Sequence, residues 1–364
     1  MGGPGRPGKS RKRRRLALVA AGTAFALAAG GTAWAAIGSA TAPLSTAAIT
    51  SKTDPGLVDI NTTIDYGQAA AAGTGMVLTS NGEVLTNNHV IEGATSIKVR
   101  DIGNGQTYTA KVVGYSDTDD VAVLQLQGAS GLATVSIGSS SGVTTGQRIV
   151  ALGNAEGRGG TPAVATGSVT ALGAAITAED EGDGTLEHLN NMIQTNAPIE
   201  PGDSGGPLLN ASGQVVGMDT AASNDNGQTG TTADVTTTAF AIPISRAISI
   251  ADQIEAGTTS GTVHVGETAF LGVAVSTQSG QQGFGQASTG APIEGVIKNT
   301  PAAEIGLASG DTITAIGGHD VAAASDLQGL IQQYRPGDKV SVTWTDSSGQ
   351  SHTATVTLVA GPAG

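Results

Sequence analysis

Residues 196–210 read NAPIEPGDSGGPLLN and place Ser204 in a glycine-rich turn. Two upstream segments belong with it: residues 85–93, LTNNHVIEG, contain His89, and residues 117–126, DTDDVAVLQL, contain Asp120. A serine hydroxyl is a poor nucleophile until an imidazole takes its proton, and the imidazole needs an acceptor on its other nitrogen. The three segments therefore predict a catalytic triad of His89, Asp120 and Ser204.

The glycines of residues 202–207, GDSGGP, relax the backbone around Ser204 and leave room for the main chain of a bound peptide. The N–H groups of Gly202 and Ser204 are expected to converge on one oxygen and form an oxyanion hole. GDSGGP alone is a moderately specific signal. It becomes a strong one when the histidine and aspartate segments precede it in this order.

The sequence offers several candidates for the general base and for the carboxylate that orients it. The chain has five histidines, and only His89 ends a predicted β-hairpin inside such a motif. Asp117, Asp119 and Asp120 compete for the carboxylate role. Asp120 directly precedes the apolar run VAVL, at the mouth of a predicted strand, whereas the other two are expected to solvate a turn.

Short β-type runs dominate the chain from residue 71 onward, and aromatic residues make up only 3% of it. The runs fall into two successive series, which predict two β-barrels within a mostly β protein. A helix is expected over residues 245–256, capped by Ser245 and ended by Gly257.

The segments AAGTGMVLTSNGEVLTNNHVI, DVAVL and IQTNAPIEPGDSGGPLLN resemble the trypsin-like proteases of the HtrA (Deg) family over roughly residues 70–250. The resemblance implies two six-stranded chymotrypsin-like barrels with the active site between them. The chain departs from the family pattern at Asn196, Glu200 and Asp203. Asp203 is typical of digestive trypsin-like enzymes, where it pairs with a newly cleaved N-terminus, but no IVGG-type start is present, so zymogen activation is not inferred.

The substrate pocket is assigned to Pro198 and Thr220. Resemblance to trypsin-like enzymes places Pro198, six residues before Ser204, at the base of the pocket for the residue preceding the scissile bond. The lack of a carboxylate there argues against a preference for Lys or Arg and favours a small or medium apolar side chain. The strand of residues 215–221 is a candidate for pairing with an extended substrate.

The C-terminal part of the chain resembles a PDZ domain, a small α/β module. Its carboxylate-binding loop is assigned to Phe270, Leu271, Gly272 and Val273, and residues 295–321 follow the usual pattern of that module. The strand after the loop would take up peptide C-termini by β-augmentation, and a helix over residues 323–333 would form the other wall of the groove. The alternative is a module used only for internal packing or oligomer contacts.

The N-terminus predicts export. Residues 1–15 hold seven of the 17 Lys and Arg residues, and residues 16–37 are an uncharged run long enough for an apolar transmembrane helix. Ala33-Trp34-Ala35 also fits a signal-peptide cleavage site, so a cleaved signal peptide and a membrane anchor both remain open. In either case the catalytic domain is expected outside the cytoplasm. The predicted segments are the signal or anchor at 1–37, a flexible spacer at 38–65, the protease domain at 66–256, a linker at 257–266 and the PDZ domain at 267–360.

Composition excludes several functions. The net charge is −13 although the basic cluster lies at the N-terminus, so the body of the chain repels nucleic acid. There is no cysteine, which excludes disulfides, thiolate catalysis and cysteine-ligated metals. The acidic residues 178–187 lack EF-hand spacing and are interpreted as a solvated loop. No cofactor and no metal are expected.

The favoured function is an ATP-independent serine endopeptidase of the cell envelope, acting on misfolded or exported proteins. This substrate class comes only from the resemblance, as does a homotrimer as the candidate assembly. A dedicated signalling protease that cuts one membrane partner would use the same chemistry. The alternative from another class is a catalytically silent peptide-binding or chaperone-like protein, and the intact triad speaks against it.

Overall fold

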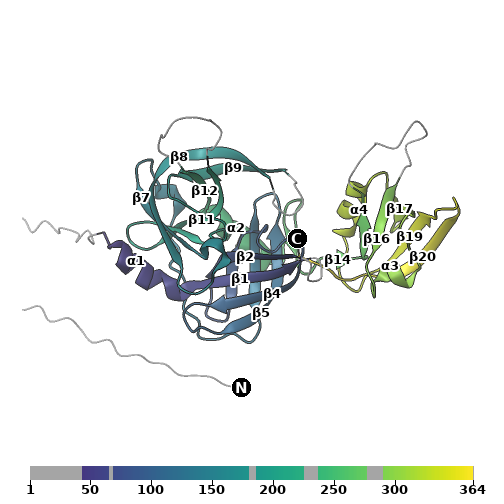
Figure 1. Cartoon of the computed structure of the whole chain (residues 1–364), viewed down its shortest axis with the longest axis horizontal. Helices are drawn as coiled ribbons and strands as arrows, with labels where there is room; N and C mark the ends of the chain where they lie inside the picture. Colours follow the sequence, from purple (N-terminus) through teal and green to yellow (C-terminus); the bar gives the residue numbers. More distant parts are fainter. Residues whose placement is uncertain (1–42, 65–68, 180–185, 225–236, 277–289, 364) are drawn as a thin grey trace, which may run out of the picture. The chain divides into compact units, whose positions relative to one another are not determined.

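The computed structural model describes residues 43–64, 69–179, 186–224, 237–276 and 290–363 (Figure 1). The described residues form three β-structures. Two of them lie in the segment predicted to be the protease domain, and the third is the C-terminal module. The mostly β architecture predicted from the sequence is therefore confirmed.

The first sheet is preceded by the helix α1 (Thr46–Thr53) and the 3₁₀ turn η1 (Asp54–Gly56). Its strand order is β13-β5-β4-β1-β2-β3-β6, and β5 also pairs with β6, so β1 to β6 close on themselves. Alternation fixes which face is buried: in β4, Ile97 and Val99 are buried while Lys98 and Arg100 are exposed. The strands are β1 (Leu57–Ile64), β2 (Ala69–Val77), β3 (Glu83–Thr86), β4 (Ala94–Asp101), β5 (Thr107–Ser116), β6 (Val121–Leu126) and β13 (His264–Val265).

The second sheet is a closed six-stranded barrel in the order β10-β11-β12-β9-β8-β7. Its strands are β7 (Arg148–Gly153), β8 (Ala163–Glu179), β9 (Leu186–Thr195), β10 (Pro207–Leu209), β11 (Val215–Asn224) and β12 (Thr237–Pro243). The short turns η3 (Ser140–Gly142) and η4 (Ala155–Gly157) flank β7. Ser204 lies in the turn between β9 and β10.

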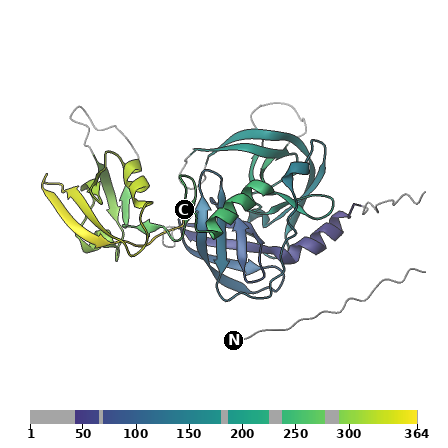
Figure 2. The same cartoon turned by 180° about the vertical axis from the view of Figure 1, so that it is seen from behind.

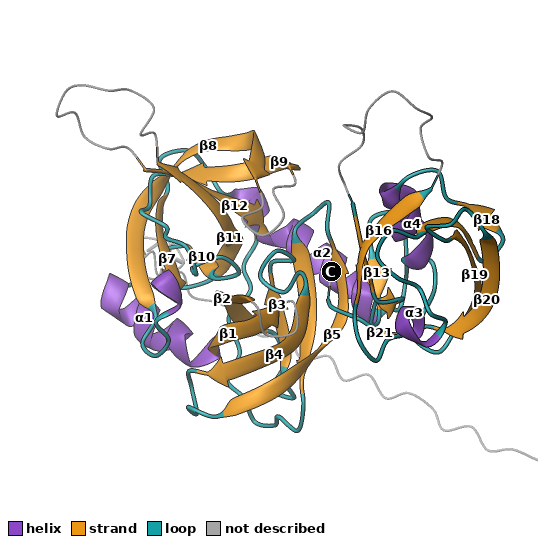
Figure 3. Ribbon diagram, turned by 45° about the vertical axis from the view of Figure 1, so that its right-hand side comes forward, coloured by secondary structure: helices purple, strands orange, loops and turns teal. Residues whose placement is uncertain are grey.

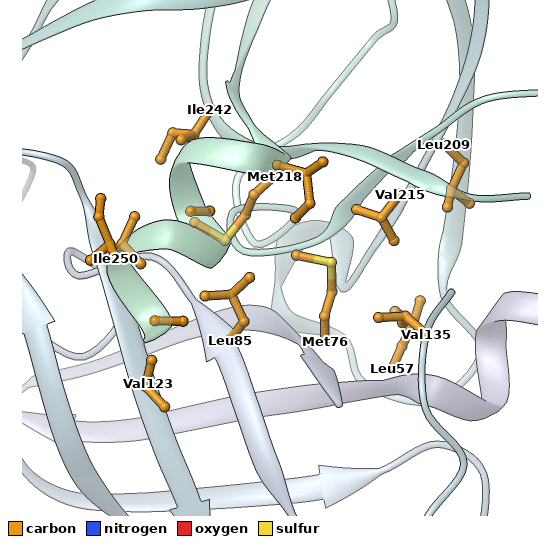
Figure 4. Close-up of a cluster of buried hydrophobic side chains, with 14 of the residues drawn as sticks. Leu57, Met76, Leu85, Val123, Val135, Leu209, Val215, Met218, Ile242 and Ile250 are labelled. Atoms are coloured by element: carbon orange, nitrogen blue, oxygen red, sulfur yellow. The ribbon is translucent and has the colours of Figure 1, made fainter. Parts of the chain in front are cut away.

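A shared apolar core joins the two barrels. Figure 4 shows Leu57, Met76 and Leu85 of the first sheet facing Met218 and Ile242 of the second. All five side chains are at most 1% exposed. Burial of a side chain of this size contributes about 1.5–3 kcal/mol. The contact between the barrels is therefore a continuous hydrophobic interior and leaves little freedom for one barrel to slide on the other.

Helix α2 (Ile244–Glu255) lies across both barrels (Figure 2). It buries Ile244, Ala247, Ile250, Ala251 and Ile254 on one face, at helical spacing. The predicted cap by Ser245 is wrong: the cap residue is Pro243, and the Ser245 hydroxyl bonds that of Ser140. Gly257, at φ +67°, ends the helix as predicted.

The C-terminal module has one main sheet, in the order β15-β16-β17-β19-β20, with β18 on β17 (Figure 3). The first and last strands of the module, β14 and β21, pair with each other in a separate two-stranded sheet. The elements are β14 (Ala269–Phe270), β15 (Val273–Val275), β16 (Ala291–Val296), α3 (Pro301–Glu304), β17 (Thr312–Ile316), β18 (His319–Asp320), α4 (Ala324–Ile331), β19 (Lys339–Thr345), β20 (Ser351–Thr357) and β21 (Val359–Ala360).

The two segments that the sequence predicts to be a spacer and a linker contain regular secondary structure. Most of the predicted spacer at 38–65 is α1, η1 and β1, because Leu57, Val58 and Ile60 are fully buried core residues. The predicted linker at 257–266 contributes β13, which pairs with β5. The predicted apolar helix at 16–37 lies outside the described residues. Among the residues that are described, no helix is long and apolar enough to cross a membrane.

A carboxyl cluster lies where α2 meets the first sheet. Burial, together with the neighbouring carboxyl groups of Glu255 and Asp252, raises the pKa of Glu83 on β3 to about 8. Because the folded-state pKa lies above that of the unfolded chain, folding takes up a proton between about pH 4.5 and 8. The stabilising effect of this proton is complete at the acid end of that window and lost at the alkaline end.

We predict that Glu83→Gln raises the melting temperature at pH 9, because the variant has no charge to bury beside Glu255. At pH 5 the variant and the parent should melt within about 1 °C of each other, since Glu83 is then protonated. Thermal unfolding of both at the two pH values, in a Ser204→Ala background to prevent self-cleavage, tests this. Glu255→Gln should shift the alkaline melting temperature in the same direction. An equal effect of Glu83→Gln at both pH values would contradict the assignment.

Candidate active site

His89 follows β3 in a turn that is fixed by hydrogen bonds to the Asp120 segment. Asn87, which is fully buried, donates through Nδ2 to the main-chain oxygen of Asp120 at 2.9 Å. The main-chain N–H of His89 donates to Asp120 Oδ1 at 3.1 Å. The ring nitrogen Nδ1 lies 3.0 Å from both carboxyl oxygens of Asp120. An Asp120 carboxylate therefore accepts the Nδ1 proton and leaves Nε2 as the basic nitrogen.

Asp120 occupies the turn between β5 and β6 with a φ of +51°, which is uncommon for a residue with a side chain. Its side chain is fully buried, so its oxygens need hydrogen-bond donors. His89 supplies two donors from the first barrel. The Thr220 hydroxyl, from β11 of the second barrel, donates to Oδ2.

Ser204 is tied to the same residue of β11. Its hydroxyl donates to the main-chain oxygen of Thr220 at 3.1 Å. Thr220 thus contacts the carboxyl group with its side chain and the serine with its backbone. His89, Asp120 and Ser204, which lie far apart in the sequence, belong to one hydrogen-bonded network at the junction of the two barrels.

The peptide units around Ser204 have a defined direction. The oxygen of Pro201 accepts from the N–H of Glu156 at 2.6 Å, and that of Asp203 accepts from Gly206 at 2.8 Å. In a trans peptide the N–H points away from the C=O, so the N–H groups of Gly202 and Ser204 point away from these donors. Within the described part of the chain, neither N–H donates to a protein acceptor.

Gly202 is required by close packing as well as by its conformation. Its φ is +93°, and a Cβ there would lie 2.3 Å from the oxygen of Asn154. The loop after β7 therefore presses directly against the turn that carries Ser204.

Two carboxyl groups are buried behind Ser204. Burial raises the pKa of Asp219 well above its usual range, and Asp203 adds to this effect. Neither oxygen of Asp219 has a hydrogen-bond partner among the described residues. Burial also raises the pKa of Asp203 to about 6, although its Oδ2 accepts from the N–H of Glu200 at 3.0 Å. Burial thus favours the neutral form of both carboxyl groups.

The turn of Asp120 is fixed from outside by an ion pair. Asp119 pairs with Arg246 of α2, and Ser116 donates to Asp119 Oδ2 at 3.0 Å. Arg246 also donates to the oxygen of Asn190 on β9 at 2.7 Å. The expectation that Asp119 only solvates a turn is wrong, because α2 brings a guanidinium to it. No spacing in the sequence relates residue 246 to residue 119.

The two residues predicted to line the substrate pocket, Pro198 and Thr220, differ in burial. Pro198 is exposed, whereas Thr220 is buried and bonded to Asp120 and Ser204. The assignment of Pro198 to the specificity pocket stays a prediction. The described residues contain no cluster of three or more His, Cys, Asp or Glu that could hold a metal ion.

The predicted carboxylate-binding loop runs from the end of β14 into β15. Phe270 closes β14 and Val273 opens β15. Leu271 accepts from the N–H of Ala302 at 2.9 Å, which anchors the loop to α3. Gly272 has a φ of +92°, and a Cβ there would lie 2.1 Å from Thr300 Oγ1. Only glycine fits at this position.

Two known protein families match segments of this chain and define the class of protein to which it belongs. Residues 73–218 match the trypsin-like peptidase domain, and residues 269–358 match the PDZ domain. The protein is thus a trypsin-like peptidase domain joined to a PDZ domain. In this domain order and in its relatives the chain is HtrA-like, as the resemblance in its motifs predicted.

The relatives include proteases from several bacteria. Serine protease PepD of Mycobacterium tuberculosis is 33% identical over 87% of this chain and 66% of that protein. Serine protease Do-like HtrB of Bacillus subtilis is 36% identical over 71% of this chain and 55% of that protein. Periplasmic serine endoprotease DegP of Salmonella typhimurium is 32% identical over 75% and 54%. The chain spans between about half and two thirds of the length of these relatives.

We predict that Arg246→Ala lowers kcat/KM roughly three- to tenfold, because the Asp120 turn loses its outer support; this corresponds to about 0.7–1.4 kcal/mol. Asp119→Asn should have a similar effect. The double variant should lose little more than either single one, since both changes remove the same pair. Steady-state kinetics on all four proteins complete this double-mutant cycle. Additive losses would show that Arg246 and Asp119 act independently.

Proposed function

We propose that this protein is a serine endopeptidase that cleaves peptide bonds through an acyl-enzyme. The observation that carries the proposal is the network joining His89, Asp120 and Ser204 through Thr220. His89 Nε2 would take the proton of Ser204 as the hydroxyl attacks the scissile carbonyl carbon. Asp120 would hold the imidazole in orientation and stabilise its protonated form.

The N–H groups of Gly202 and Ser204 would stabilise the oxyanion of the tetrahedral intermediate. His89 would then give its proton to the leaving amine, and the C–N bond would break to leave an ester on Ser204. Water would then lose a proton to His89 as it attacks the ester carbonyl, the ester bond to Ser204 would break, and His89 would return the proton to the Ser204 oxygen as the acid product leaves. The directed and unpaired N–H groups of the Ser204 turn support this assignment.

The substrates are proposed to be unfolded or exported proteins outside the cytoplasm. Support comes from the basic and apolar N-terminal sequence and from the similarity to the periplasmic serine endoprotease DegP of Salmonella typhimurium. The PDZ domain is proposed to bind peptide C-termini at residues 270–273. Attachment to the membrane, a homotrimeric assembly and a preference for small or medium apolar residues before the scissile bond belong to the same proposal.

We predict that Ser204→Ala and His89→Ala each lower casein hydrolysis by on the order of 10⁴-fold or more, with folding intact. A phosphonylating serine probe should label the wild type at Ser204 and fail to label His89→Ala, because the hydroxyl then has no base. Gel-based labelling and mass spectrometry measure this. Binding of denatured casein without cleavage by either wild type or Ser204→Ala would instead support the silent peptide-binding alternative.

We predict that Gly272→Ala weakens binding of a peptide with a free, apolar C-terminal residue by at least about tenfold, because the new methyl group collides with Thr300 and disturbs the loop. Fluorescence anisotropy with a labelled peptide measures the affinity. Gly295→Ala is the matched control, since its added Cβ meets only the Cβ of Ala274, at 3.9 Å. Equal affinities of the two variants would count against the loop as the binding site.

A further inference from the structure

Thr74 on β2 contacts the Ser204 turn with both its backbone and its side chain. Its main-chain N–H donates to the oxygen of Ser204 at 2.8 Å. Its hydroxyl donates to the oxygen of Gly202 at 2.8 Å. The side chain is supplied by the first barrel and only 2% of the residue is exposed, so water does not compete for these bonds.

The direction of the hydroxyl bond is fixed by a third partner. The main-chain N–H of Asn154, which follows β7, donates to Thr74 Oγ1 at 2.8 Å. An N–H cannot accept, and a hydroxyl has a single proton, so the proton of Thr74 must go to Gly202. The main-chain oxygen of Thr74 in turn accepts from the Thr86 hydroxyl at 2.7 Å. Thr74 therefore joins β2, the loop after β7 and the Ser204 turn.

The carbonyl groups of the Ser204 turn are held by different kinds of donor. Those of Pro201, Asp203 and Ser204 accept from main-chain N–H groups. The carbonyl of Gly202 accepts from the Thr74 side chain. This carbonyl shares a peptide unit with the N–H of Asp203, and that unit lies between the two units that carry the N–H groups of Gly202 and Ser204. Gly202 has the backbone freedom to let the intervening unit rotate if the hydroxyl bond is lost, and such a rotation would change how the two flanking N–H groups are turned toward each other. The relative orientation of the two N–H groups therefore depends in part on a hydroxyl group in the other barrel.

We propose that Thr74 is a positioning residue for the oxyanion hole: its hydroxyl holds the Gly202 carbonyl so that the N–H groups of Gly202 and Ser204 face the oxyanion. This inference rests on the proposed function. Thr74 does not touch the substrate and acts through Gly202. Its loss should consequently impair stabilisation of the tetrahedral intermediate more than binding of the ground-state peptide.

The test compares four proteins and two kinds of ligand. Thr74→Val keeps the shape and removes the hydroxyl, whereas Thr74→Ser keeps the hydroxyl. Thr62→Val is the matched control: Thr62 is 3% exposed and its hydroxyl donates to Ala71 at 3.2 Å, within the same pair of strands. The measurements are kcat and KM on a peptide substrate, inhibition by a peptide boronic acid, which forms a tetrahedral adduct, and inhibition by the cleaved peptide product.

Thr74→Val is expected to lower kcat about 10- to 100-fold, by analogy with the loss of one oxyanion donor, with little change in KM. Affinity for the boronic acid should fall in parallel, whereas affinity for the product should stay within about twofold. Thr74→Ser should recover most of the activity. Thr62→Val should lower the melting temperature and leave kcat unchanged. If Thr74→Val does not fold, Thr74→Cys, a weaker donor, should lie below Thr74→Ser in kcat.

Three outcomes would overturn the inference. Thr74→Val with the kcat and boronic-acid affinity of the wild type removes the role of the hydroxyl while leaving the protease assignment intact. Equal losses of kcat in Thr74→Val and Thr62→Val would show a general effect of destabilisation. A wild-type protein that neither cleaves peptide nor binds the boronic acid would defeat the proposed function itself, and the inference with it.

Discussion

The buried carboxyl group of Asp120 is the constraint on which the site depends. A carboxylate removed from water must be matched by hydrogen bonds or it destabilises the fold. Its donors come from both barrels, His89 from the first and Thr220 from the second. All of its donors are therefore in place only when the barrels are docked, so that formation of this hydrogen-bonded network and assembly of the peptidase domain are one event.

Docking is secured at three places around this group. Leu57, Met76 and Met218 belong to the apolar core that joins the barrels. Arg246 of α2 links the turn before Asp120 to β9. Thr74 links β2 to the turn of Ser204. Each contact bridges elements distant in sequence, and each constrains a different part of the site: the interface between the barrels, the turn of Asp120 and the turn of Ser204.

Much of this arrangement could be predicted from the sequence, because the residues that indicate it are close in sequence to the site residues. The glycines around Ser204, the apolar run after Asp120 and the hairpin before His89 are neighbours of the residues that they position. The domain order follows from the same local motifs. The ordered part of the predicted spacer was missed because the Ala, Thr and Ser residues at 46–53 have the composition of a linker, although they form helix α1, and the buried strand β1 follows.

The contributions of Thr74, Arg246 and Asp219 could not be predicted, because they depend on the folding of distant segments. Thr74 stands in a Gly-Thr-Gly run with nothing to indicate that Ser204 is its partner. Asp219 has the appearance of an ordinary polar residue in a strand, although it is fully buried. Long-range hydrogen bonds define the roles of Thr74 and Arg246, and burial defines the environment of Asp219.

The short strand β13 changes where the peptidase domain ends. His264 and Val265 pair with Tyr115 and Gly114 of β5, and the His264 ring stacks on that of Tyr115 at 4.9 Å. A fragment cut after α2 would lack this cover and leave an unpaired edge on β5, open to association with other chains. A fragment that keeps β5 covered therefore has to extend through Val265, and a shorter part of the segment between the domains is available as a linker than its glycine and threonine content suggests.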